Sequence, residues 1–140
     1  MTYSIAITDD VQACVALRIA VFVDEQKVPM EDEIDTLDGE AVHILATHDG
    51  KPVGTARLLQ EGAAGRIGRV CILADHRGTG LGAQLMTYAI DALRARGGLT
   101  SIQLAAQSYA TGFYQRFGFE VIGPDYDDGG IPHCKMELRL

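Results

Sequence analysis

The apolar residues of this chain fall into short runs typical of strands and longer stretches with helical spacing. Short runs predict strands over 3–7, 41–47, 52–60 and 67–73. An Asp49-Gly50 pair separates the second run from the third and favours a hairpin. The fourth run is apolar except for Gly68 and Arg69, so we expect it to be a buried central strand.

Three stretches have the spacing of amphipathic helices. In the first, apolar residues follow one face from Val11 to Phe22, and Arg18 is a charge on that face. The second runs over 79–96 and ends at Gly97-Gly98. The third opens at Gln107-Ser108, ends at Gly118, and has one stripe made of Ala110, Phe113, Tyr114 and Phe117. Strands over 101–105 and 119–122, a polar loop over 124–130 and a last strand from His133 to Leu138, led into by Ile131-Pro132, complete a single α/β domain over 1–140.

The segment over 22–40 is rich in carboxylates, contains Pro29 and has no clear periodicity, so we expect a loop. An acidic loop is usually a solvated face. This one is long for a connection in a compact domain, and a functional lid or a substrate wall is therefore the alternative.

Arg57 and Arg69 raise the question of what neutralises them. If the turn between their strands is symmetric about Ala63, the two arginines lie directly opposite each other, which is unfavourable for like charges. An anion should therefore lie between them. The candidates are a structural cluster with Glu25, Glu33 and Asp35, or the carboxylate of a substrate. Arg18 has the same two interpretations.

The composition excludes several classes of function. With 47% hydrophobic and 22% charged residues among 140, the chain is an ordinary globular domain. A net charge of −7 argues against nucleic acid, although a local site could still bind an anion. No apolar run approaches the roughly 20 residues of a membrane span and no signal peptide is visible, so we expect a cytoplasmic protein. Cys14, Cys71 and Cys134 form no C-x-x-C pair and are expected to be reduced, buried thiols.

The stretch Arg77-Gly78-Thr79-Gly80-Leu81-Gly82 follows the central strand and opens the second helix. Glycines let a ligand approach the backbone, and the first N–H groups of a helix attract anions. The stretch therefore predicts a seat for a phosphate or pyrophosphate, with a ligand-free turn as the alternative. A P-loop is excluded because no Lys-Ser or Lys-Thr follows. A dinucleotide site needs a further Gly and then an acidic residue after a second strand, about 20 positions on; here position 83 is Ala, and Gly97-Gly98 closes the helix instead.

The pattern R-G-x-G-x-G after an apolar strand resembles the acetyl-coenzyme A (acetyl-CoA) loop of the GNAT superfamily of N-acetyltransferases. A second motif of that superfamily is N-x-x-A-x-x-x-Y-x-x-x-G-F. It is matched at every spacing, with Gln in place of Asn, by Gln107, Ala110, Tyr114, Gly118 and Phe119. The segments VFVDEQKVP, GRVCIL, AAQSYATGFYQRFGF and GIPHCKM more narrowly resemble the ElaA/YjcF-type subgroup.

The resemblance implies a GNAT fold of the α/β (α+β) type. Its mixed central sheet of about six or seven strands splays around the acetyl-CoA site and is flanked by about four helices. The implied pyrophosphate contacts are the N–H groups of Arg77, Gly78, Thr79, Gly80, Leu81 and Gly82. The pantetheine arm would lie along Val70, Cys71 and Ile72, with an oxyanion donor near Ile72. Gln107, Phe113 and Tyr114 would also contact the cofactor, although Gln107 is equally consistent with a plain helix cap.

Acetyl transfer to an amine needs an acid for the leaving sulfur and a route for the amine proton. By resemblance Tyr114 is the general acid; a packing role on its apolar stripe is the alternative. Some members of the superfamily carry a glutamate base on the central strand. This chain has no Asp or Glu over 66–74, so a base must come from another segment. His133 has the best-suited intrinsic pKa, Glu25 is second, and water with a backbone carbonyl is third. His43 is expected to be a strand residue and His76 a loop residue.

The resemblance therefore predicts an acetyl-CoA-dependent N-acyltransferase that acts on a primary amine by direct transfer in a ternary complex, without a metal. A non-catalytic acyl-CoA-binding sensor is the alternative from another class. Cys71 could carry an acyl group in a ping-pong route, but a small buried hydrophobe is the stronger interpretation. The candidate acceptor contacts are Arg18, Glu25, Arg57, Arg69 and His133. The arginines fit a zwitterion, and the acidic segment fits a polyamine or a lysine side chain. Dimers are common in the superfamily, so the resemblance is consistent with a homodimer but leaves the oligomeric state open.

Overall fold

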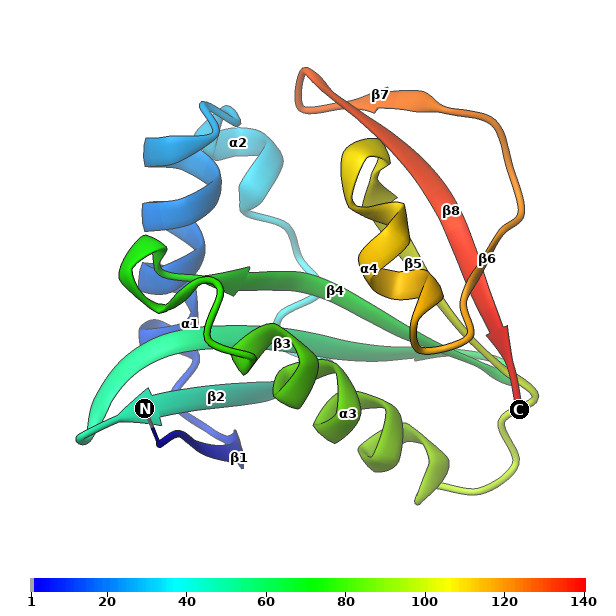
Figure 1. The fold of residues 1–140 in the computed structure, drawn as a ribbon, viewed down its shortest axis with the longest axis horizontal. Helices are drawn as coiled ribbons and strands as arrows, with labels where there is room; N and C mark the ends of the chain where they lie inside the picture. The colour runs from blue at the N-terminus through cyan, green and yellow to red at the C-terminus, as the bar shows by residue number, and fades with distance from the viewer. Residues whose placement is uncertain (1) are drawn as a thin grey trace.

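Within residues 2–140, which the computed structural model describes, eight strands form one mixed sheet (Figure 1). Their order is β1-β2-β3-β4-β5-β8-β6, and β7 pairs with β8. The strands are β1 (Ser4–Thr8), β2 (Val42–His48), β3 (Lys51–Glu61), β4 (Ala64–Ile72), β5 (Ser101–Gln107), β6 (Glu120–Val121), β7 (Tyr126–Asp128) and β8 (Ile131–Arg139). The predicted mixed sheet is confirmed, but β7 lies in a segment that was predicted to be a loop.

Four α-helices flank the sheet: α1 (Val11–Arg18), α2 (Met30–Glu33), α3 (Leu81–Arg94) and α4 (Thr111–Gln115). A π-helical turn, η1 (Ile19–Glu25), continues α1, and the 3-10 turns η2 (Ala74–His76) and η3 (Ser108–Ala110) precede α3 and α4. The prediction of a plain loop over 22–40 is wrong, because the end of η1 and all of α2 lie there. No described helix is long and apolar enough to cross a bilayer.

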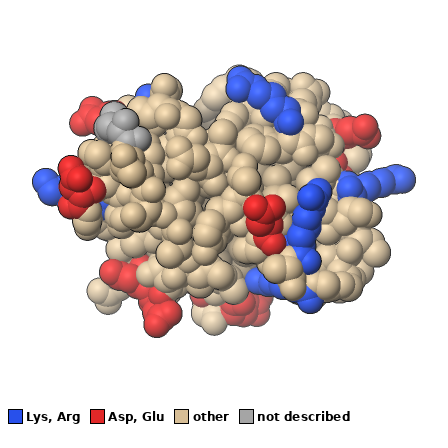
Figure 2. All heavy atoms as spheres, turned by 60° about the horizontal axis from the view of Figure 1, so that its bottom comes forward, with Lys and Arg blue, Asp and Glu red and all other residues tan. Residues whose placement is uncertain are grey.

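The helices α1 and α3 cover opposite faces of the sheet (Figure 1). The buried face of α3 packs into the main core and consists of Leu81, Leu85, Met86, Ala89, Ile90 and Leu93. On the other face, Leu17 and Val21 pack on Cys71 in a smaller cluster. Figure 2 shows the side on which α3 lies: its surface is mostly uncharged, and its described basic residues form no continuous patch.

A β-bulge in β4 changes which face its side chains meet. Arg57 pairs with Gly68 and Thr55 pairs with Cys71, so β4 has one extra residue between these pairs. Arg69 lies there with a φ of 52°. The extra residue reverses the alternation of side chains, which is why Ile67 belongs to the main core and Cys71 to the α1 cluster.

The predicted direct opposition of Arg57 and Arg69 is wrong. Glu61 pairs with Ala64, so the turn after β3 has two residues, and its centre lies half a residue before Ala63. This shift changes the partner of Arg57 from Arg69 to Gly68. Register depends on turn length in this way because a strand has a side-chain period of two.

β4 and β5 pair in parallel only at their beginnings, where Ala64–Arg66 meets 101–103. Beyond this point β4 continues alongside β3 and β5 continues alongside β8, and the two strands diverge (Figure 1). The edge of β4 that faces β5 therefore has no partner among the described strands after Arg66. This splay positions the candidate site.

Candidate active site

The turn from β4 into α3 has the geometry of an anion-binding site. Gly78 and Gly80 have φ values of 74° and 88°, and a Cβ at either position would meet no atom within 4 Å. The backbone thus faces open space. Gly80 precedes α3 without a side-chain cap, so the first N–H groups of α3 remain available. These groups and the helix dipole fit the phosphate or pyrophosphate that the sequence predicts.

Side chains behind this turn fix its backbone. The Tyr3 hydroxyl lies 3.0 Å from His76 Nδ1 and donates to Thr79 Oγ1 at 3.1 Å. Thr79 Oγ1 donates in turn to the His76 carbonyl at 2.7 Å. These contacts agree with the expected role of His76 as a loop residue, and they join the turn to the residue before β1.

Arg77 ties the turn to η1. Its Nε donates to the Ile72 carbonyl at 3.0 Å, and its Nη2 contacts the two Glu25 carboxylate oxygens at 3.0 and 2.8 Å. Glu25 therefore does not lie between Arg57 and Arg69, contrary to one of the expectations. Its oxygens are occupied by Arg77 and it does not line the cavity described below, so the geometry disfavours Glu25 as a base.

The unpaired edge of β4 presents a backbone donor. The Leu73 N–H donates to the Val53 carbonyl of β3 at 2.9 Å. Because backbone groups alternate in direction along a strand, the Ile72 N–H points away from β3, toward the opening. The Ile72 carbonyl, which accepts from Arg77, points the same way. This edge can pair with an amide-containing ligand, and the Ile72 N–H can stabilise an oxyanion.

A cavity of about 500 Å³ occupies the opening between β4 and β5. Its lining comes from β3, β4, β5, α4 and β8 and from the segments around α2 and β7, and it includes Gly68, Val70, Leu104, Tyr114 and His133. The connection before α2 meets the β7–β8 turn at the rim, where a Cβ at Gly129 would lie 3.1 Å from Val28 Cγ1. The segment before and through α2 and the β7–β8 hairpin thus flank the splay, and we call them its two arms. The predicted acid Tyr114 and the predicted base His133 both line the cavity between them.

Tyr114 lies on α4 among aromatic rings. Its centroid is 5.1 Å from that of Phe113 and 6.4 Å from that of Phe119, both in edge-on geometry. Burial raises the pKa of the Tyr114 hydroxyl to about 12, so the phenol stays protonated at neutral pH. The hydroxyl bonds to no other described residue, and Tyr114 lines the cavity. The ring therefore packs while the hydroxyl remains free to donate.

Phe113 faces the anion-binding turn. A Cβ at Gly82 would lie 3.4 Å from Phe113 Cζ, so the ring packs beside the first turn of α3. This contact joins α4 to the turn across the splay. It fits the cofactor contact that the resemblance implies for Phe113.

His133 has a defined tautomer. Its Nδ1 lies 2.8 Å from the Ile131 carbonyl, and because a carbonyl only accepts, Nδ1 carries the proton. The ring also stacks on Tyr126, with centroids 6.1 Å apart and planes at 30°. The neutral imidazole thus has a free lone pair on Nε2, which is the group that a base at this cavity requires.

Gln107 bridges the mouth of the splay. Its Nε2 donates to Gln26 Oε1 at 2.8 Å, and its Oε1 accepts from the Tyr109 hydroxyl. It makes no capping hydrogen bond to η3, so the helix-cap interpretation is wrong. Gln26 could not be identified from the sequence, because its partner Gln107 lies 81 positions away and no local pattern connects the two residues.

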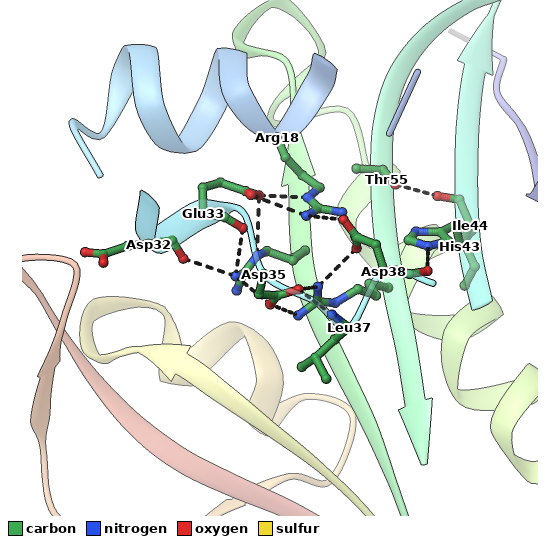
Figure 3. A network of polar contacts seen from close by, with 11 residues as sticks. Arg18, Asp32, Glu33, Asp35, Leu37, Asp38, His43, Ile44 and Thr55 are labelled. Atoms are coloured by element: carbon green, nitrogen blue, oxygen red, sulfur yellow. Dashed lines mark hydrogen bonds and ion pairs between the residues drawn. The ribbon is translucent and has the colours of Figure 1, made fainter. Parts of the chain in front are cut away.

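Three arginines and three carboxylates fasten the acidic segment to the sheet (Figure 3). Arg18 lies 2.7 Å from Glu33 and 2.9 Å from Asp38, and the side chains of Arg18 and Glu33 are each 1% exposed. Because a buried charge needs a partner, this pairing explains the charge on the apolar face of α1. The structural interpretation of Arg18 is confirmed, and Arg18 does not line the cavity.

Arg57 and Arg69 join the same network. Arg57 Nη1 lies 2.9 Å from Asp35 and 3.1 Å from Asp38, and Arg69 lies 3.4 Å from Glu33 and 3.3 Å from Asp35. The predicted pairing with Glu33 and Asp35 is confirmed, although both arginines also line the cavity. Asp38 was missed, since nothing in the sequence distinguished it from its acidic neighbours.

Two further side chains behave as structural groups. His43 is buried, and its Nε2 lies 3.0 Å from the Asp38 carbonyl, as expected for a strand histidine. Burial raises the pKa of the Cys71 thiol to about 12, so its thiolate is strongly disfavoured. Cys71 packs with Leu17 and Val21 as a small hydrophobe, which argues against an acyl-cysteine route.

Comparisons with known proteins place the chain in a family. The Acetyltransferase (GNAT) domain matches residues 10–140. The Bacillus subtilis N-acetyltransferase YjcF is 40% identical over 121 residues, covering 86% of each protein. Escherichia coli ElaA superposes with a TM-score of 0.86 at 31% identity over 99% of each chain, and an acyl-CoA N-acyltransferase from Pseudomonas aeruginosa with 0.86 at 34% over 98% of each. This chain therefore belongs to the GNAT acetyltransferase family. Its homologues include YjcF and ElaA, the subgroup that the sequence motifs indicated.

We expect Arg18→Met to lower the free energy of unfolding by about 3 kcal/mol, because the buried Glu33 would lose its two hydrogen bonds from Arg18 and keep only the longer contact with Arg69. Arg66→Met is the matched control: Arg66 pairs with Glu61 at 2.9 Å, and both side chains are exposed. Its loss should change the free energy by less than about 1 kcal/mol. Urea denaturation measures both, and equal effects would contradict a buried structural network.

Acid should weaken the same network. Burial alone would raise the pKa of Asp35, but hydrogen bonds from Arg57 and the Leu37 N–H, with the charges of Arg57 and Arg69, hold it below its usual value. Asp38 likewise has a lowered pKa, because hydrogen bonds from Arg18 and Arg57 outweigh its burial. A lowered folded-state pKa stabilises the fold fully above the unfolded value of about 3.9, and this stabilisation is lost as the pH falls from there.

The free energy of unfolding should therefore decline below about pH 4, and less steeply in Asp35→Asn/Asp38→Asn. Denaturation in urea at a series of pH values measures the slope. Asp127→Asn is the control, since Asp127 is exposed and makes no ion pair with another described residue. An unchanged slope in the double variant would show that these carboxylates do not carry the acid sensitivity.

Proposed function

We propose that this protein transfers the acetyl group of acetyl-CoA directly to a primary amine within a ternary complex. One observation carries the proposal: the unpaired edge of β4 leads from the anion-binding turn at α3 to the cavity lined by Tyr114 and His133. Family membership supports acetyl transfer, and the likeness to an acyl-CoA N-acyltransferase supports an amine acceptor.

Backbone groups would hold the donor. The N–H groups from Gly78 to Gly82 would bind the pyrophosphate, and the β4 edge at Val70 and Ile72 would pair with the amides of the pantetheine arm. The thioester supplies an acetyl group that is already activated toward nitrogen.

The acceptor must present its nitrogen as a free amine. The nitrogen lone pair forms the C–N bond as the C–S bond breaks, and the nitrogen loses one proton. We assign His133 Nε2 to accept this proton, because its lone pair is free and His133 lines the cavity. Water with a backbone carbonyl is the alternative acceptor.

Two donors would act on the reacting thioester, one on its carbonyl oxygen and one on its sulfur. The Ile72 N–H, which points into the opening, would stabilise the charge that develops on the oxygen. The Tyr114 hydroxyl would give its proton to the leaving sulfur, so that CoA departs as a thiol. The raised pKa makes the Tyr114 hydroxyl a weak acid. Its proton should contribute most to the rate below the high pH range in which the sulfur leaves as a thiolate without a proton.

Tyr114→Phe should therefore lower kcat by about 100-fold or more and change the affinity for CoA little, because the hydroxyl acts only as the thioester breaks. The loss should shrink at high pH, where the thiolate leaves without a proton. Thiol release with a primary amine gives kcat, and calorimetric titration with CoA gives the affinity.

Tyr88→Phe is the matched control, since the Tyr88 hydroxyl accepts from the Ile7 N–H and Tyr88 does not line the cavity. A parental rate in Tyr114→Phe would remove the acid role from Tyr114. If the parent protein binds CoA but releases no thiol with any amine, the transfer activity is wrong and the acyl-CoA sensor takes its place.

A further inference from the structure

The positive side chains that line the cavity all have carboxylate partners. Arg57 contacts Asp35 and Asp38, and Arg69 contacts Glu33 and Asp35. Arg66 pairs with Glu61 at 2.9 Å. A substrate carboxylate would have to displace a protein carboxylate that is already held in place. The cavity is therefore poorly suited to the zwitterionic acceptor that two unpaired arginines would favour.

Three carboxylates that line the cavity have no partner. Asp32 of α2, Asp128 of β7 and Glu40 make no hydrogen bond or ion pair through their carboxylates with another described residue. Figure 3 shows the Asp32 carboxylate pointing away from the arginine network, and only its backbone carbonyl contacts Arg69, at 3.5 Å. The charged side chains of the lining that lack a partner of opposite charge are therefore all carboxylates. They lie on both arms, with Asp32 on α2 and Asp128 on β7.

Apolar side chains form part of the cavity wall. They include Phe22, Val28, Leu59, Val70, Leu104 and Ile131. An aliphatic chain loses unfavourable contact with water against these side chains.

From this arrangement we propose that the acceptor is an aliphatic diamine or polyamine. This inference rests on the proposed function. One amine reacts beside Tyr114 and His133 by the step given above, and its methylene chain lies on the apolar part of the wall. The distal ammonium is held by Asp32 and Asp128 at the rim. These carboxylates select the acceptor and take no part in the proton transfers.

Three matched acceptors test the proposal. Cadaverine has two amines, pentylamine has the same chain with one, and lysine is cadaverine with an added carboxylate. We expect kcat/KM for cadaverine to exceed that for either of the others by at least about tenfold, with the advantage falling at high salt. Thiol release under saturating acetyl-CoA measures all three.

Paired variants test the residues. Asp32→Asn/Asp128→Asn should lower kcat/KM for cadaverine about tenfold, through KM, and leave pentylamine unchanged. Glu31→Gln/Asp127→Asn removes the same charge from neighbouring positions that do not line the cavity, and should change neither acceptor. Calorimetric CoA binding checks that the donor site is intact in both.

The outcomes separate this inference from the proposed function. Equal use of pentylamine and cadaverine, or equal effects of the two double variants, overturns the diamine acceptor and leaves amine acetylation standing. A preference for free lysine would show carboxylate recognition, and a preference for a lysine-containing peptide would show a protein acceptor; either overturns it as well. No thiol release with any amine, despite CoA binding, overturns both proposals.

Discussion

The site depends on the loss of pairing between β4 and β5 after Arg66. A parallel strand pair normally uses its inner backbone groups for the ladder, and an open edge inside a domain exposes donors and acceptors. Here β4 keeps β3 as its partner and β5 keeps β8, so the sheet remains continuous at its base while it opens above. The opening provides room for a ligand, a backbone edge for pairing, and access from the turn at α3.

The bulge at Arg69 and the charge network hold this opening in shape. The bulge turns Cys71 toward α1 and lets the Arg69 guanidinium reach Glu33 and Asp35. The network in turn holds α2 against β3 and β4, which forms one arm of the cavity. Removing one member of a buried ion-pair network is costly, because it leaves a buried charge without a partner. The intact network nevertheless adds little net stability, because burying its charges also has a cost. We interpret it as a device that fixes the position of the arm and removes positive charge from the cavity.

Local patterns in the sequence predicted the parts of the fold that depend on local physics. The glycine-rich turn, the apolar face of α3 and the spacing around Tyr114 each follow from residues within a few positions of one another. They predicted a seat for an anion at the turn before α3, whereas the acid role of Tyr114 was implied by the family resemblance and stays a prediction. The β3–β4 register was wrong by one residue, because it depends on a two-residue turn that the sequence did not distinguish from a longer one.

The contacts that could not be predicted join distant segments. Asp38 meets Arg18 and Arg57, Glu25 meets Arg77, and Gln107 meets Gln26, all through tertiary packing of the acidic segment. The two arginines predicted an anion near Arg57 and Arg69, but the pattern left open whether that anion belonged to the protein or to a substrate. That choice decides the charge of the cavity, and only the arrangement of side chains resolved it.

The central claim is direct transfer between two substrates that occupy this opening together. Initial rates of thiol release, with acetyl-CoA and an amine acceptor both varied, test it most directly. The account predicts double-reciprocal lines that intersect, because both substrates must be bound before the acetyl group moves. Parallel lines would indicate a covalent acyl-enzyme, and would contradict the structural role given to the buried Cys71 and the shared cavity of Tyr114 and His133.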